Sequence, residues 1–114
     1  MEGECSLRLV GKELFPNHCD NIFPVLNRLT WIYKRATWLP HQPHIAAGHL
    51  AMREVLCTDG QIRPQTLATP KGRTKLAAGL KGLAARAATY KLNPVAELGS
   101  EVVAILKRAG YLEG

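Results

Sequence analysis

The cationic side chains of residues 60–96 offer the clearest chemistry in the sequence, because no Asp or Glu lies among them. A stretch of one sign creates a local field that attracts polyanions such as nucleic acid. The whole chain has a formal net charge of +6. This pattern predicts an anionic partner, and a solvated face that serves solubility is the alternative. The cations of the stretch are Arg63, Lys71, Arg73, Lys75, Lys81, Arg86 and Lys91.

Three of these cations, Lys71, Arg73 and Lys75, fall at the expected start of a helix, where the helix dipole is positive and disfavours them. Such a cluster needs a nearby anion. The sequence leaves two sources open, a bound anionic ligand or a carboxylate of this chain such as Glu54 or Glu97.

Three histidines and a cysteine in the middle of the chain are the residues whose types suit a metal ion. The spacing from His41 to His44, His49 and Cys57 matches no common zinc pattern, and Pro43 separates the first two. We therefore expect ordinary surface or half-buried imidazoles, with no metal and no cofactor.

Patterns for catalysis or cofactor binding are missing from the sequence. It contains no phosphate-binding P-loop and no GxGxxG motif. Glu97 and Glu101 lie one helical turn apart, a spacing typical of a solvated helix face. We expect a protein that binds and does not catalyse.

Composition sets the broad class and the compartment. A hydrophobic share of 46% in 114 residues is typical of a globular chain of single-domain size. An odd number of cysteines without CxxC spacing, Cys5, Cys19 and Cys57, indicates free thiols in a reducing compartment. No apolar run long enough to span a membrane occurs, and the acidic, polar start does not resemble a secretory signal. We expect no membrane contact and a cytoplasmic location.

The first half of the chain has the periodicity of two helices and two short strands. Residues 6–14 form a helix that Ser6 caps, and residues 20–30 form a second helix with Pro24 in its first turn. Residues 31–34 and 37–39 are rich in β-forming side chains. We expect no regular element directly after them, because Pro40 and Pro43 interrupt the backbone pattern.

The second half predicts a hairpin followed by helices. The hairpin covers residues 49–68 and turns at Asp59-Gly60. Thr69-Pro70 is a typical helix start, and one helix is expected to run to about residue 89. Asn93-Pro94 opens a last helix over residues 94–109, which Gly110 ends.

Four segments in this order resemble the C-terminal KilA-C (ANT) domain of phage antirepressor proteins, over residues 6–80. The resemblance implies a phage or prophage origin, a regulatory role, and a location in the bacterial host cytoplasm. Domains of this family are regarded as winged-helix-like DNA binders or as parts of antirepressors that bind repressors. The matching residues are Lys12, Glu13 and Leu14; Leu26, Arg28 and Tyr33; Trp38, Pro40, Gln42, Ile45, Gly48 and Leu50; and Thr66, Thr69, Pro70, Lys71 and Gly72.

We expect an α+β fold: a winged-helix-like domain, with a helix-turn-helix and a β-hairpin wing, followed by two C-terminal helices. Residues 1–90 form the KilA-C-like domain, and the helix of residues 91–114 packs on it or pairs two copies into a homodimer. In the winged-helix arrangement, helix 20–30 enters the major groove of double-stranded DNA and the hairpin flanks it. The residues expected to contact DNA are Arg28, Lys34, Arg35, Arg63, Lys71, Arg73 and Lys75.

The alternative function is protein binding, by an antirepressor or anti-defence inhibitor that sequesters a repressor or host protein. Helix 20–30 has few side chains suited to reading bases, namely Asn21, Asn27 and Arg28, and this favours the alternative. The basic stretch of residues 60–96 favours DNA.

Overall fold

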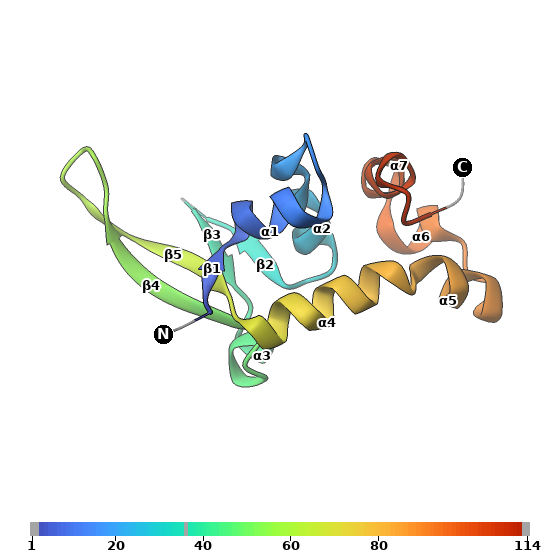
Figure 1. The fold of residues 1–114 in the computed structure, drawn as a ribbon, viewed down its shortest axis with the longest axis horizontal. Helices are drawn as coiled ribbons and strands as arrows, with labels where there is room; N and C mark the ends of the chain where they lie inside the picture. Colours follow the sequence, from blue (N-terminus) through green and yellow to red (C-terminus); the bar gives the residue numbers. More distant parts are fainter. Residues whose placement is uncertain (1–2, 36, 113–114) are drawn as a thin grey trace.

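The structure is a computed structural model that describes residues 3–35 and 37–112. The expected domain limits at residues 1 and 114 therefore lie outside the described residues. Figure 1 shows three parts: a body of helices and short strands, a two-stranded arm that projects from it, and a helical run beneath the body. The fold mixes helices with small antiparallel sheets, as the sequence predicts, whereas the winged-helix arrangement stays a prediction.

The first part of the body confirms the two expected helices. After strand β1 (Cys5–Ser6), helix α1 covers Leu7–Leu14, and the Ser6 hydroxyl accepts the Leu9 N–H at 3.2 Å as a cap. A 3-10 turn, η1 (Cys19–Asn21), leads into α2 (Ile22–Arg28).

Two short strands follow α2, as expected. β2 (Ile32–Lys34) and β3 (Trp38–Pro40) pair antiparallel, with Tyr33 opposite Leu39. The expectation of no regular element directly after them is wrong, because α3 covers Gln42–Ala46. Pro43 lies in the first turn of α3, where a backbone N–H has no partner within the helix and its loss carries no cost.

The arm is the expected hairpin. β4 (Leu50–Leu56) and β5 (Ile62–Ala68) pair antiparallel, and β1 pairs with the other edge of β5. At the turn, Gly60 has a φ of +84° and the Asp59 carboxylate accepts the Gln61 N–H at 3.0 Å. The Asp-Gly pair thus has the turn role that its sequence predicts.

Helix α4 (Pro70–Lys81) starts as predicted, because the Thr69 hydroxyl accepts the Gly72 N–H at 3.0 Å. The expectation of one helix to residue 89 is wrong. At Gly82, ψ is −2° where a regular α-helix has about −42°, and α5 (Leu83–Tyr90) follows as a separate helix.

The expected helix of residues 94–109 is also divided. Gly99 has a φ of +84°, which side chains with a Cβ rarely adopt, and it separates α6 (Pro94–Leu98) from α7 (Ser100–Ala109). Gly110 ends α7, as predicted, with a φ of +89°. The two C-terminal helices predicted after the hairpin are therefore four successive helices, α4 to α7.

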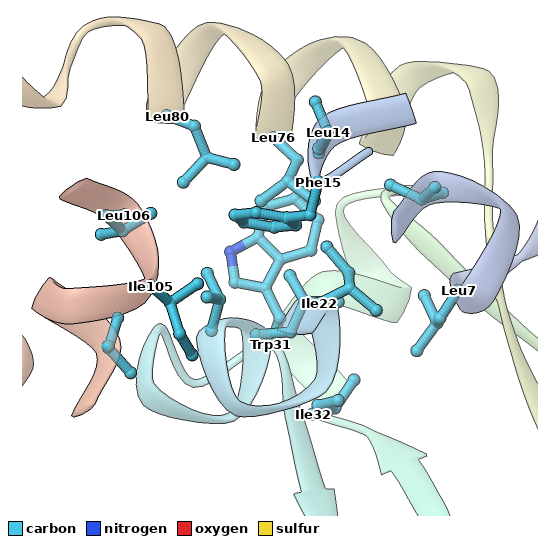
Figure 2. Close-up of a cluster of buried hydrophobic side chains, with 14 of the residues drawn as sticks. Leu7, Leu14, Phe15, Ile22, Trp31, Ile32, Leu76, Leu80, Ile105 and Leu106 are labelled. Atoms are coloured by element: carbon cyan, nitrogen blue, oxygen red, sulfur yellow. The ribbon is translucent and has the colours of Figure 1, made fainter. Parts of the chain in front are cut away.

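One apolar core joins elements that are distant in sequence. Figure 2 shows the Trp31 indole at its centre, with Leu76 and Leu80 of α4 on one side and Ile105 and Leu106 of α7 beside them. The Tyr111 hydroxyl donates to the Leu14 carbonyl at 2.8 Å, so the segment after α7 is fixed to α1. Among the described helices, none has the length and apolar character needed to cross a bilayer.

Candidate functional site

Helix α2, the expected recognition helix, lies in the middle of the body. Ile22, Val25 and Leu26 are fully buried in the core, and only Asn27 and Arg28 of this helix are exposed. Arg28 is near Gly99, at the junction of α6 and α7. A helix buried in this way presents one turn at most to a DNA groove, so the role of Arg28 in DNA contact stays a prediction.

Lys34 and Arg35 lie at the turn between β2 and β3. The Lys34 ammonium is 5.0 Å from the centre of the Trp38 ring, and the Arg35 guanidinium is 5.6 Å from the centre of the Tyr33 ring. These cation–π contacts hold both cations against aromatic faces while their side chains stay exposed. Both cations remain accessible to an anionic partner.

Arg63 lies near the tip of the arm and is bonded to its neighbour across the turn. Its guanidinium is 2.6 Å from the Asp59 carboxylate. The Gln61 N–H and then Arg63 lower the pKa of Asp59, since both stabilise the carboxylate. This pair makes the tip nearly neutral, which weakens the attraction of Arg63 to a phosphate.

The first turns of α4 hold the other three expected contacts. Arg73 forms an ion pair with Glu13 of α1, so the carboxylate that compensates this cluster is neither Glu54 nor Glu97, the two named from the sequence. Lys71 and Lys75 are exposed, and neither forms an ion pair within the part of the chain that the structure describes. One helical turn separates them, so both face solvent from the first turns of α4.

The seven expected residues do not form one continuous face. Lys71, Arg73 and Lys75 lie together at the start of α4, and Lys34 and Arg35 lie together at the β2–β3 turn. Arg63 is close to the tip of the arm, whereas Arg28 ends α2 in the body and lies beside Gly99, between α6 and α7. The start of α4 is therefore the one part of the predicted surface where three of these residues meet.

An apolar surface at the tip of the arm was missed by sequence reasoning. Leu56 is 70% exposed, Ile62 is 65% exposed and Met52 is 55% exposed. Leu56 and Ile62 are cross-strand partners at the end of the hairpin. Met52 is on the same face but nearer the body, with the exposed Glu54 between it and Leu56, because side chains alternate along a strand. The sequence does contain a signal for this surface, because an apolar residue stands on each side of the Cys57–Gln61 turn. We call Met52, Leu56 and Ile62 the arm tip.

The outer edge of β4 is open beside the arm tip. The strand order is β1, β5, β4, so no described strand pairs with that edge. The Cys57 N–H bonds the Gln61 carbonyl at 2.8 Å, and backbone bonding to the partner alternates along an antiparallel strand. The N–H and C=O groups of Leu56, Glu54 and Met52 therefore face outward, in position to pair with another chain.

The histidines gather at the base of the arm. The Nδ1 atoms of His44 and His49 are 3.0 Å apart, and both rings stack on Trp31, at centroid distances of 4.2 and 5.2 Å. Burial, then His49 and His41, lower the pKa of His44 from 6.5. Cys57 is at the opposite end of the arm. Within residues 3–35 and 37–112, no group of three or more His, Cys, Asp or Glu side chains is arranged for a metal.

These features describe a mixed α and β domain with two prominent surfaces, the apolar arm tip and the cationic start of α4. The family model described as phage antirepressor protein KilAC domain matches residues 2–82, which is more than half of the chain. The chain therefore belongs to this family and is a phage regulatory protein. The match ends at Gly82, where α4 ends. Searches of curated proteins and of solved structures found no match.

Proposed function

We propose that this chain acts as an antirepressor by binding a phage repressor protein through the arm tip. The observation that supports this most is the exposure of Met52, Leu56 and Ile62 on one face of a projecting hairpin. Apolar side chains gathered on an exposed surface are typical of protein interaction sites. A repressor bound there is held away from its operator.

The open edge of β4 supports the same kind of partner. A strand that adds to an exposed edge gains main-chain hydrogen bonds, and apolar side chains beside the edge supply specificity. Leu56 and Met52 combine both features, because their backbone groups face outward and their side chains are exposed. DNA offers neither strand-like backbone groups nor an apolar pocket.

The arginines also favour a protein partner. A carboxylate beside an arginine offsets part of its positive charge, which weakens the attraction of that arginine to a phosphate. Four arginines of this chain are paired in this way. The pairs are Arg8 with Asp20, Arg53 with Glu4, Arg63 with Asp59 and Arg73 with Glu13.

The test uses operator DNA and the repressor encoded by the same phage or prophage. Addition of this chain should release the operator, as measured by mobility shift. The double variant Leu56→Glu, Ile62→Glu should weaken release by at least about tenfold, since charge replaces the apolar contact. The control Thr58→Glu, Gln61→Glu adds the same charge at exposed polar positions of the same turn and should stay active. Release that is equal in both variants would overturn the proposal, as would no release by the unmodified chain.

DNA binding is the second candidate function, and Lys71 and Lys75 favour it. They are exposed, one helical turn apart, within a 37-position stretch, residues 60–96, that has no Asp or Glu. Such cations contact phosphates and release counterions, which makes affinity fall as salt rises. In this arrangement the start of α4 lies along the DNA backbone.

A mobility-shift titration on random duplex DNA at about 50 and 200 mM salt tests this candidate. We expect affinity to fall steeply with salt and to be lost in the variant Lys71→Glu, Lys75→Glu. The control Lys107→Glu, Arg108→Glu makes the same change of net charge at the exposed end of α7. No shift at the lower salt concentration would exclude the candidate, and equal loss in both variants would place the effect on net charge alone.

A further inference from the structure

Helix α5 is largely exposed. It reads LAARAATY and contains no buried residue, although most of its side chains are apolar. It begins at Leu83, directly after the last residue that the family model matches. A helix of this composition normally buries one face against a neighbour. Leu83 and Ala84, at its start, pack against the core, and the exposed remainder is open to a partner.

A groove lies between α5 and α6, at the end of the molecule opposite the arm (Figure 1). Its volume is about 370 Å³. Leu83, Ala87 and Tyr90 line it along α5 at helical spacing, and Leu92 and Leu98 line it from the following segments. Tyr90 is 70% exposed, so the apolar lining is open to solvent.

The charges around the groove are unequal on its two sides. On the α5 side, Arg86 lines the groove and Lys91 follows the helix as its cap. On the α6 side, Glu97 is the acidic residue of the lining. An occupant with carboxylates along the edge that faces α5 therefore complements the site.

We propose that this groove binds an amphipathic helix of a partner protein, with an apolar stripe inward and carboxylates toward Arg86 and Lys91. Side chains at the spacing of Leu83, Ala87 and Tyr90 form a ridge that packs into the grooves of another helix. Helix-in-groove binding uses anchors of the same spacing on the ligand. This surface is separate from the arm tip and does not depend on the antirepressor proposal.

The test measures fluorescence anisotropy of labelled helical peptides with the full chain at low salt. One peptide of about 16 residues has leucines on one stripe and Glu along its flank, and the second has Lys in place of each Glu. We expect the Glu peptide to bind at least about tenfold more tightly, and Arg86→Glu to reverse this preference. Equal or absent binding of the two peptides would overturn the proposal.

Two further variants locate the binding surface. Tyr90→Glu, Leu92→Glu changes exposed side chains of the groove and should abolish binding of the Glu peptide. Leu56→Glu, Ile62→Glu on the arm tip is the matched control with the same change of charge and should leave that binding unchanged. Light scattering on the unmodified chain adds a last outcome: a dimer that the Tyr90→Glu, Leu92→Glu variant dissociates would show that a second copy fills the groove, which contradicts a partner helix.

Discussion

Helices α4 and α5 are neighbours in sequence, but they differ in how much of each helix is buried. In α4, Thr69 caps the helix, Arg73 pairs with Glu13, and Leu76 and Leu80 enter the core. Helix α5 has no buried residue and borders an open groove. The contrast separates two tasks: α4 stabilises the domain, and α5 leaves a face available for binding.

The largest expected difference between the two helices comes from their leucines. Leu80 is 1% exposed, and Leu80→Ala should lower the free energy of unfolding by about 2–5 kcal/mol through lost contacts and a cavity. Leu83 is half-buried beside the groove, so Leu83→Ala should cost less than about 1 kcal/mol. Urea denaturation measures both. Equal losses would show that α5 is as firmly packed as α4.

Two glycines of α4 give the next largest contrast. Gly72 lies against the His49 carbonyl, so the added Cβ of Gly72→Ala collides with backbone and should cost about 1–3 kcal/mol. Gly79 has no neighbouring atom within 4 Å of a Cβ, so Gly79→Ala should stabilise the helix by up to about 1 kcal/mol. Thermal melting distinguishes these opposite signs. A gain in both variants would mean that α4 does not lie against the His49 carbonyl as described.

A smaller effect is expected from the helix cap. Thr69→Ala removes the acceptor of the Gly72 N–H and also a hydroxyl that donates to the Gly48 carbonyl at 2.5 Å. We expect a loss of about 1 kcal/mol. Thr89→Ala, at an exposed position of α5, is the control and should change stability little. A loss of similar size in the control would remove the contrast between the two helices.

The smallest expected effect is a dependence of the unfolding free energy on pH, and it comes from His44 at the base of the arm. The pKa of His44 is lowered from 6.5, so the unfolded chain binds more protons at this residue in mildly acidic solution. The contribution of neutral His44 to the free energy of unfolding is therefore fully present above pH 6.5 and is lost as the pH falls below this value. Unfolding free energies between about pH 7.5 and 5.5 should show this slope. His44→Gln should reduce the slope, whereas His18→Gln, at an exposed position, should retain it.

Local chemistry explains which elements the sequence predicts correctly. Ser6 and Thr69 cap helices, and Asp59-Gly60 turns the hairpin, because each acts on backbone groups within a few residues. Gly79 and Gly82 show where prediction from local sequence fails. Gly79 continues α4 and Gly82 ends it, although both glycines interrupt the same helical pattern. The helical pattern of the sequence treats both positions alike and does not distinguish them.

The candidate site was predictable in part for the same reason. The cations at the start of α4 follow from the Thr69-Pro70 signal, and the structure places them together. Their carboxylate partner was not predictable, because Glu13 is 60 positions away and only the tertiary fold brings it to Arg73. The exposure of Leu56 and Ile62 was also not predictable, because a strand pattern does not show which part of a hairpin projects beyond the rest of the protein.

The hydrogen bond from Tyr111 to Leu14 joins residues 97 positions apart, and it has a consequence for synthesis of the chain. Phe15 and Leu26 pack in the same core as Val102 and Leu106, so α1 and α2 emerge from the ribosome before the residues that cover them exist. Contacts this distant in sequence form late, after the loop between them has closed. Part of the core of the nascent protein therefore stays uncovered until residues 100–112 have left the exit tunnel, and it is open to aggregation during that time.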